Sequence, residues 1–319
     1  MKEIGGYFEL ELPEHDLSKV PSGRLVNSGR HALEYIIRSS KDEIKYIWLP
    51  HYTCDVVLEP LVRCGVDFRY YHINDSFEIA DDISLSDGEY IIVNNYFGIK
   101  DEYISTVSAK YGNRLIIDNA QAFYCPPIRN TYSIYSPRKF FGLPDGGIAS
   151  GVAGFNEDLR AGDSFDRCSH LLKRIDTGAS SGYQDFKTNS RQLKEEPLTA
   201  MSNLTRRILG SIDFERVRTK RCRNFETLHS ALAISNKLTL PDTDSFACPM
   251  VYPFLTDDAD LRQRLIDNKV FVATYWPNVL SQCNHDSLEY HFARNLLPLP
   301  IDQRYGEDEM KTIIEIINH

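Results

Sequence analysis

The sequence predicts an α/β protein whose mostly parallel sheet is covered by helices on both faces. Two observations lead to this fold class. In the first half of the chain, short runs rich in β-branched and aromatic residues alternate with segments whose apolar residues recur at helical spacing. Such alternation is typical of parallel strands joined by crossover helices. Hydrophobic residues make up 42% and charged residues 25% of the chain, which is the composition of an ordinary globular protein.

The expected elements of the first half follow one another closely. A helix is expected over 28–40, where Ser28 is placed to cap the first turn, and a short strand over 44–50 ends at a proline. The same patterns predict, in order, a helix in 53–65, strands in 66–73 and 89–97, a helix in 102–112 and a strand in 114–118. Ligands of parallel sheets collect at the carboxyl ends of the strands, and Asp118 lies at such an end.

The pattern changes after residue 150. The polar stretch 177–197 is interpreted as a long loop or lid, and one long helix is expected from about Leu198 to Ala233. A strand in 250–256, a helix and a strand within 258–277 and a final helix in 308–318 then predict a smaller α/β unit. We therefore expect a large domain over 1–235, which includes the lid, and a small C-terminal domain over 236–319.

Composition argues against several classes of function. The net charge of -9, without a Lys/Arg-rich block, disfavours a nucleic-acid partner. Seven cysteines, an odd number without a C-x-x-C pair, are expected to be free thiols in a reducing compartment and not a disulfide framework or a metal site. No stretch approaches the roughly 18 apolar residues that a membrane helix needs. A cytoplasmic protein without a membrane or nucleic-acid partner is the expectation.

The stretch IDNAQAFYC, residues 117–125, places an acid where a buried strand ends. A buried carboxylate is costly unless it meets a positive partner, so Asp118 either caps a turn or holds a cation. Farther along, 132–150 combines hydroxyl side chains with Arg138 and Lys139 and ends in a Gly-Gly turn. A lysine near serines is, taken alone, usually a solvated surface residue. After a strand-end acid it fits pyridoxal phosphate, because the carboxylate keeps the pyridine nitrogen protonated and the amine holds the aldehyde as a Schiff base.

Four segments are similar to motifs of a known family. They are a Ser-Gly-x-x-Ala-Leu-like helix start in 27–37, an Asp-x-Ala-Gln motif in 116–123, a lysine segment in 136–147 and a Leu-Pro segment with a last helix in 295–317. Together they resemble the DegT/DnrJ/EryC1/StrS sugar aminotransferases, which are fold type I enzymes that depend on pyridoxal phosphate. The resemblance implies an aspartate aminotransferase-like fold with a seven-stranded sheet.

The resemblance also implies a function. Such enzymes take an amino group from an amino acid, as a rule glutamate, and pass it by ping-pong chemistry to a nucleotide-linked keto sugar in amino-sugar and polysaccharide biosynthesis. The cofactor alternates between pyridoxal phosphate and pyridoxamine phosphate. Family sites are completed across a subunit boundary, which implies a homodimer.

The resemblance assigns roles around the cofactor ring to three residues. Lys139 would form the Schiff base with the cofactor and later shuttle the substrate proton. Asp118 would pair with the ring nitrogen, and Gln121 would lie near the 3'-oxygen. Arg138, beside the lysine, either influences it as a nearby cation or forms a surface salt bridge.

The resemblance also assigns residues to the binding of the cofactor phosphate. The backbone amides of Gly29 and Arg30, which follow Ser28 at the helix start, would bind this phosphate, because a helix N-terminus favours an anion. Ser133 or Ser136 would add a hydroxyl group. His31 in the same helix either contacts a ligand or is a packed helix histidine.

The chain departs from the family pattern at three places. The family's serine before the lysine has no counterpart at Ile134, and the aromatic residue that stacks on the ring falls on Cys54. Tyr52 or Tyr96 are the alternative rings, although a strand-end tyrosine is as a rule a core residue. The segment that reaches the partner's site is not recognisable in 183–203, where Ser202 and Asn203 are candidates.

Two residues are candidates for substrate contact, and two functions remain open. Tyr275 and Trp276 lie in the tract that is near the sugar in the family, or they pack between the two domains. The favoured function is the aminotransferase, which the intact Asp118, Gln121 and Lys139 support. The alternative is a catalytically degenerate homologue that binds pyridoxal phosphate or a sugar nucleotide as a sensor or scaffold.

Overall fold

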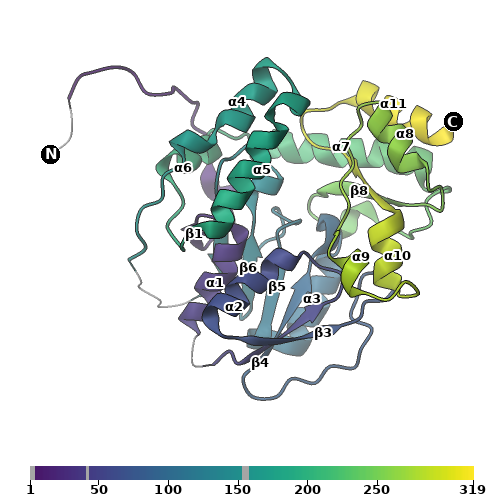
Figure 1. Ribbon diagram of the computed structural model, residues 1–319, viewed down its shortest axis with the longest axis horizontal. Coiled ribbons are helices and arrows are strands. Elements are labelled where there is room, and N and C mark those ends of the chain that lie inside the picture. The colour runs from purple at the N-terminus through teal and green to yellow at the C-terminus, as the bar shows by residue number, and fades with distance from the viewer. Residues whose placement is uncertain (1–3, 41–42, 153–157) are drawn as a thin grey trace.

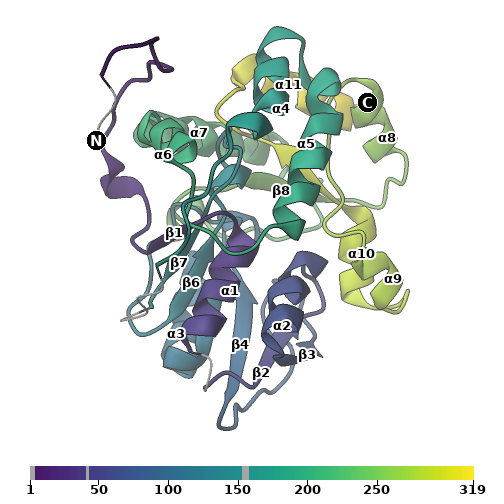
Figure 2. The ribbon, with the colours of Figure 1, turned by 60° about the vertical axis from the view of Figure 1, so that its left-hand side comes forward.

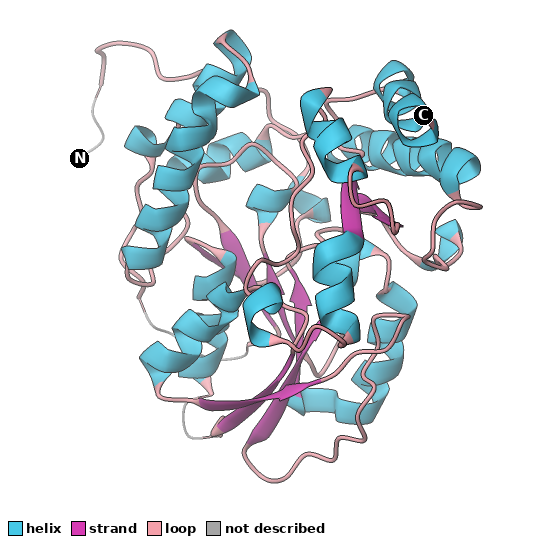
Figure 3. Ribbon diagram, turned by 45° about the vertical axis from the view of Figure 1, so that its right-hand side comes forward, coloured by secondary structure: helices cyan, strands magenta, loops and turns pink. Residues whose placement is uncertain are grey.

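A seven-stranded sheet forms the centre of the protein, and a separate two-stranded sheet lies toward the C-terminus (Figures 1 and 3). The computed structural model describes residues 4–40, 43–152 and 158–319. The strand order of the large sheet is β1-β7-β6-β5-β4-β2-β3. Its strands are β1 (Arg24–Val26), β2 (Tyr46–Pro50), β3 (Asp67–Tyr71), β4 (Glu89–Asn94), β5 (Leu115–Asn119), β6 (Tyr132–Tyr135) and β7 (Gly147–Ser150).

Strands β2 to β6 are parallel, whereas β7 is antiparallel to β6 and β1 is antiparallel to β7. The predicted mostly parallel sheet is therefore confirmed. Alternate strand residues enter two separate cores: Ile92 and Ile116 belong to one, Val93 and Ile117 to the other. A sheet buried on both faces explains why these strands are almost continuously apolar.

Three helices of the first half lie where the sequence predicts them. They are α1 (Gly29–Ser39), α2 (Leu58–Cys64) and α3 (Asp101–Tyr111). The Ser28 side chain accepts a hydrogen bond from the backbone amide of His31 and so caps α1. Helix α2 ends at Gly65, whose φ of 68° is the left-handed conformation that glycine adopts without strain.

The lid prediction for 177–197 is wrong in its secondary structure. This stretch is helix α5 (Ala179–Glu195), which packs against α4 (Ser169–Asp176), and the two helices stand side by side in Figure 2. The single long helix expected after it is two helices, α6 (Asn203–Gly210) and α7 (Phe214–Leu232). The break has a local cause, because the Asp213 side chain accepts a hydrogen bond from the amide of Arg216 and starts α7.

The C-terminal part contains β8 (Val251–Leu255), α8 (Leu261–Asp267), α9 (Val279–Gln282), α10 (Leu288–Asn295), β9 (Leu296–Pro300) and α11 (Glu307–Asn318). The predicted strand at the end of 258–277 is absent, and 270–276 runs as an irregular segment. Strand β9 instead pairs with β8 in antiparallel orientation, and all five of its residues have a partner in β8. The domain boundary near residue 235 stays a prediction.

Two expectations on composition can be compared with the structure. All seven cysteines are free. Within the described ranges, no helix combines the length and the apolar character that crossing a membrane requires.

Candidate functional site

A cavity of about 340 Å³ opens at the carboxyl ends of the parallel strands. Its walls come from the start of α1, the loops after β2, β4, β5 and β6, and helix α5. Most of the predicted site residues line it: Ser28, Gly29, Arg30, Cys54, Asp118, Gln121, Ser136, Lys139 and Trp276. Residues up to 248 positions apart in the chain, Ser28 and Trp276, thus meet at the place where parallel sheets bind ligands.

Asp118 is a partly buried carboxylate at the end of β5. Its neighbours Ile117 and Asn119 are fully buried, and its Oδ1 atom accepts a hydrogen bond from the amide of Ala120 at 2.8 Å. Burial raises the pKa of Asp118, while the positive charge of Lys139 opposes that shift. Asp118 therefore both caps a turn and faces a cation, so the two interpretations of the strand-end acid hold together.

Gln121 presents a hydrogen-bond donor that has no partner within the described part of the chain. Its Oε1 atom accepts a hydrogen bond from the backbone amide of Phe97 at 2.8 Å. Because that amide can only donate, the amide group of Gln121 is oriented with its oxygen toward Phe97. The buried Nε2 atom is left unpaired in the wall of the cavity.

The N-terminus of α1 closes one end of the cavity. A Cβ atom on Gly29 would lie 3.2 Å from Cβ of Ser136, so the glycine is needed for this close approach. The Ser28 hydroxyl contacts Nδ1 of His31 at 2.7 Å, and Nε2 of His31 contacts the carbonyl oxygen of Glu196 at 3.0 Å. The carbonyl can only accept, so Nε2 carries the proton and Nδ1 accepts from Ser28. His31 is thus a packed helix histidine, and burial lowers its pKa to about 4.

Three predicted site residues do not line the cavity. Tyr96 is buried beneath it, where its hydroxyl donates to the carbonyl oxygen of Tyr52 at 2.7 Å. Ser133 is buried within β6, and Ser136 reaches the cavity instead. Tyr275 stacks on Phe97 with ring centroids 6.4 Å apart, which turns its ring to the core. Each of these side chains is held by packing in the sheet or beside it.

The aromatic residues of the cavity wall are Trp276 and Phe186. Cys54 lines the cavity at the position where the family's stacking ring falls. Tyr52 is fully buried, and its ring packs edge to face with Trp276, with ring centroids 5.0 Å apart. Phe186 and Ser190 of α5 were missed by the sequence analysis because this segment was interpreted as a loop. The segment carries no continuous apolar stripe at helical spacing, because its buried positions include Gly182 and Asn189.

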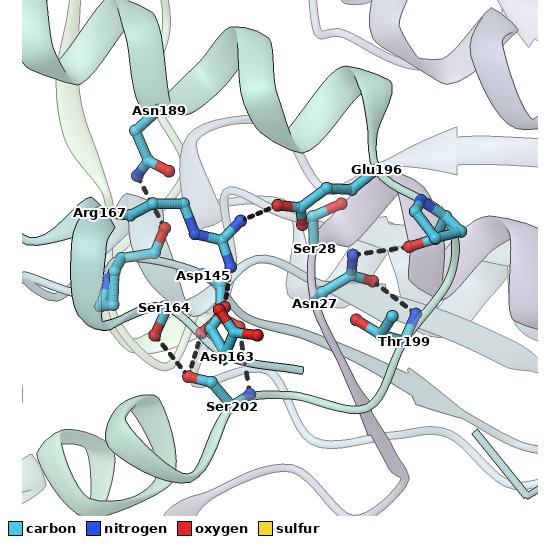
Figure 4. Close-up of polar contacts among 12 residues, drawn as sticks. Asn27, Ser28, Asp145, Asp163, Ser164, Arg167, Asn189, Glu196, Thr199 and Ser202 are labelled. Atoms are coloured by element: carbon cyan, nitrogen blue, oxygen red, sulfur yellow. Dashed lines mark hydrogen bonds and ion pairs between the residues drawn. The ribbon is translucent and has the colours of Figure 1, made fainter. Parts of the chain in front are cut away.

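A polar network joins α5 and the segment that follows it to the loop that contains Pro144 and Asp145 (Figure 4). The Asn189 side chain donates to the carbonyl oxygen of Pro144 at 2.8 Å, and Arg167 pairs with Glu196 at 2.5 Å. Ser202 donates to Asp145 through its amide and its hydroxyl, each at 3.1 Å. Ser202 is therefore buried and bonded within its own chain, and its contact with a partner subunit stays a prediction.

Comparison with known proteins adds evidence on the fold. No family model and no curated protein matches the chain. Among solved structures, Spr1654 from Streptococcus pneumoniae, a protein proposed to be a sugar aminotransferase, is 17% identical in its pyridoxal phosphate form, with a TM-score of 0.64 over 93% of this chain and 86% of that one. A DegT DnrJ EryC1 StrS aminotransferase from Brucella abortus is 14% identical, with a TM-score of 0.61 over 94% and 86%. The chain shares the fold of these two proteins.

A third structure with this fold is DesI, determined in the presence of its TDP-sugar product. It is 14% identical, with a TM-score of 0.62 over 94% of this chain and 81% of that one. The sugar aminotransferase fold spans nearly all of the chain in each comparison, so the predicted fold type is confirmed. Its mostly parallel sheet carries the cavity described above.

Proposed function

We propose that this protein is a pyridoxal phosphate-dependent aminotransferase that acts on a nucleotide-linked keto sugar. The observation that carries the proposal is that Asp118, Gln121 and Lys139 line one cavity at the carboxyl ends of the strands. The shared fold supports the reaction class. The pyridoxal phosphate form of Spr1654 supports the cofactor, and the TDP-sugar product of DesI supports a nucleotide-linked substrate.

The residues of the cavity fit this cofactor. When bound, pyridoxal phosphate supplies an electron sink that depends on a protonated ring nitrogen. Asp118 suits that nitrogen because its buried carboxylate is stabilised by a positive partner. The unpaired Nε2 atom of Gln121 suits an oxygen acceptor, and Gly29 leaves the helix N-terminus open to an anion.

Lys139 and the apolar walls have separate tasks in this proposal. The Nζ atom of Lys139 would hold the cofactor through its aldehyde, with loss of water, and as a free amine would accept the proton that leaves the substrate carbon. Leu33, Phe186 and Trp276 supply apolar surface to the wall of the cavity. Asp118 would hold the positive ring nitrogen in its ionised form, which the positive charge of Lys139 and the hydrogen bond from the amide of Ala120 favour.

The finer parts of the proposal concern donor, mechanism and assembly. We take glutamate as the amino donor, a ping-pong order of half-reactions, and a homodimer as the working unit. The resemblance of the motifs around Asp118 and Lys139 supports all three. Sedimentation of the purified protein at several concentrations tests the dimer, and a purely monomeric protein with full activity contradicts shared sites.

Absorbance spectroscopy followed by product analysis tests the function. Pyridoxal phosphate is added to the purified protein, and glutamate is added once a visible absorbance band has formed. We expect the band to convert to that of pyridoxamine phosphate, with one 2-oxoglutarate released per site. Addition of a nucleotide-linked keto sugar is then expected to restore the first band. Absence of any band contradicts the proposal.

The non-catalytic homologue is the second candidate, and Cys54 is the observation that favours it. A thiol at this position of the wall offers less contact area to a flat cofactor ring than an aromatic side chain does. The same experiment separates the two functions. A band that forms but does not respond to any amino acid supports a binder without turnover.

A further inference from the structure

Arg138 is a cation of the cavity wall without a counterion in the described part of the chain. It lies beside Lys139 in the short 3-10 turn Pro137–Lys139, and both residues line the cavity. Its Nε atom is buried and has no hydrogen-bond partner among the described residues. Neighbouring arginines differ in this respect, since Arg30 pairs with Glu59 and Arg167 pairs with Glu196, each at 2.5 Å.

The charges around Arg138 make its positive charge costly. Burial, together with Arg30 and Arg167, lowers the pKa of Arg138 to about 10, and Asp145 is the acid that opposes this shift. That carboxylate is already occupied, because it accepts hydrogen bonds from Ser202 and Thr205. A bound anion would therefore relieve an uncompensated positive charge.

Arg138 also lies near the part of the cavity that suits an anion. Arg30, the second residue of α1, is among the charges that act on it. Ser136, two positions before Arg138, approaches Gly29 at the same helix N-terminus. Backbone amides at a helix start and an arginine fork are a favourable combination for phosphate.

We propose that Arg138 binds the phosphate group of the cofactor. The inference rests on the proposed function and deepens it. The position of the family's serine is occupied by Ile134, an apolar residue of the same wall that offers no hydroxyl. A two-pronged contact from the guanidinium of Arg138 takes the place of that hydroxyl.

Two aldehydes that differ by one phosphate group test the proposal. Pyridoxal has the ring and the aldehyde of pyridoxal phosphate but no phosphate. The dissociation constants of both are measured by absorbance titration for the wild-type protein, Arg138→Gln and Arg138→Lys. Arg191→Gln is the matched control, because it removes one positive charge from an exposed position of α5 beside Ser190.

The wild-type protein is expected to prefer pyridoxal phosphate, and Arg138→Gln to lower that preference about tenfold or more while pyridoxal binds as before. Arg138→Lys is expected to be intermediate, because lysine keeps the charge but loses the planar fork. Arg191→Gln is expected to match the wild-type protein. Pyridoxal binding also reports that Arg138→Gln is folded.

Three outcomes overturn the inference. An unchanged preference in Arg138→Gln means that other groups hold the phosphate. An equal loss of affinity for both aldehydes means that Arg138 acts on Lys139 or on the fold. Failure of the wild-type protein to bind either aldehyde overturns the proposed function, and the inference with it, which distinguishes that case from the first two.

Discussion

The carbonyl oxygen of Phe140, the residue that follows Lys139, accepts a hydrogen bond from Arg221 of α7 at 3.3 Å. The same oxygen accepts a second hydrogen bond, from the side chain of Gln303 at 2.8 Å. Arg221 is 2% exposed, and its guanidinium lies 4.6 Å from the centre of the Phe140 ring. Helix α7 thereby fixes the backbone immediately after the lysine.

Arg221→Lys is expected to destabilise the protein by about 1–3 kcal/mol, because a single ammonium cannot replace the buried fork. The arginine also donates to Gln303 and to the carbonyl oxygen of Met250. Urea unfolding measures the change. Arg223→Lys on the same helix is the control, since Arg223 is exposed and pairs with Glu307 at 3.5 Å. Equal stability of the two variants would contradict the role of Arg221.

Lys139→Ala is expected to abolish covalent attachment of pyridoxal phosphate, because no other amine of the described chain lines the cavity. Borohydride reduction followed by mass spectrometry measures the attachment. Lys187→Ala, at an exposed position of α5, is expected to keep the adduct. An adduct of unchanged yield in Lys139→Ala would assign the attachment to another lysine.

Local patterns were sufficient to predict β2 to β5, β8 and much of the site, but not β1, β6, β7 or β9. Strand β5 and its terminal Asp118 follow from an apolar run that ends in an acid, and Lys139 follows from its Ser-rich turn. Helix α5 was not predictable in the same way, because its buried positions include Gly182 and Asn189 and lack a continuous apolar stripe.

Contacts between distant segments decided what the sequence left open. The Asn189 side chain bonds to Pro144, which holds α5 over the cavity and brings Phe186 into its wall. Tyr96 is a candidate for stacking on the cofactor ring in the sequence, but in the structure it is buried and its hydroxyl donates to the carbonyl oxygen of Tyr52. Which side of a strand end faces a ligand depends on tertiary packing, which a single sequence does not specify.

Asp118→Asn is expected to separate stability from function. Burial raises the folded-state pKa of Asp118 above its ordinary value of 3.8, so its charge costs folding free energy at neutral pH. The variant without cofactor is therefore expected to be as stable as the wild-type protein or more stable. The half-reaction with glutamate is expected to slow on the order of 100-fold or more, because the ring nitrogen loses its counterion.

Thermal unfolding and stopped-flow absorbance measure these two effects of Asp118→Asn. Asp87→Asn is the control, since Asp87 is an exposed acid paired with Arg114. It is expected to change neither quantity. Wild-type turnover in Asp118→Asn would show that another acid faces the ring nitrogen.

Phe186→Ala is expected to weaken binding of the sugar substrate. Phe186 lines the cavity but is 47% exposed. Its replacement by alanine therefore removes apolar surface from the cavity wall with little loss of folding free energy. We expect KM for the keto sugar to rise about tenfold with kcat nearly unchanged. Tyr183→Ala on the same helix, 57% exposed and outside the cavity wall, is the control. Equal KM values for both variants would exclude Phe186 from the sugar site.

His31 makes the stability of the protein sensitive to acid. Its folded-state pKa is lowered from 6.5 to about 4, so between these values the unfolded chain binds more protons than the folded one. The contribution of His31 to stability is therefore lost as the pH falls through this range, by about 3 kcal/mol in total, and this contribution is constant above about pH 6.5.

His31→Gln tests this dependence, because glutamine keeps a donor for the carbonyl of Glu196 but does not titrate. Urea unfolding at a series of pH values measures both proteins. Asp118 and Asp145, whose pKa values burial raises, act in the opposite direction. Both acids are present in the two proteins, so the difference between the two curves isolates His31. Between pH 6.5 and 4 the wild-type protein is expected to lose up to about 3 kcal/mol of stability relative to His31→Gln. Parallel curves would mean that His31 takes up its proton without cost in the folded state.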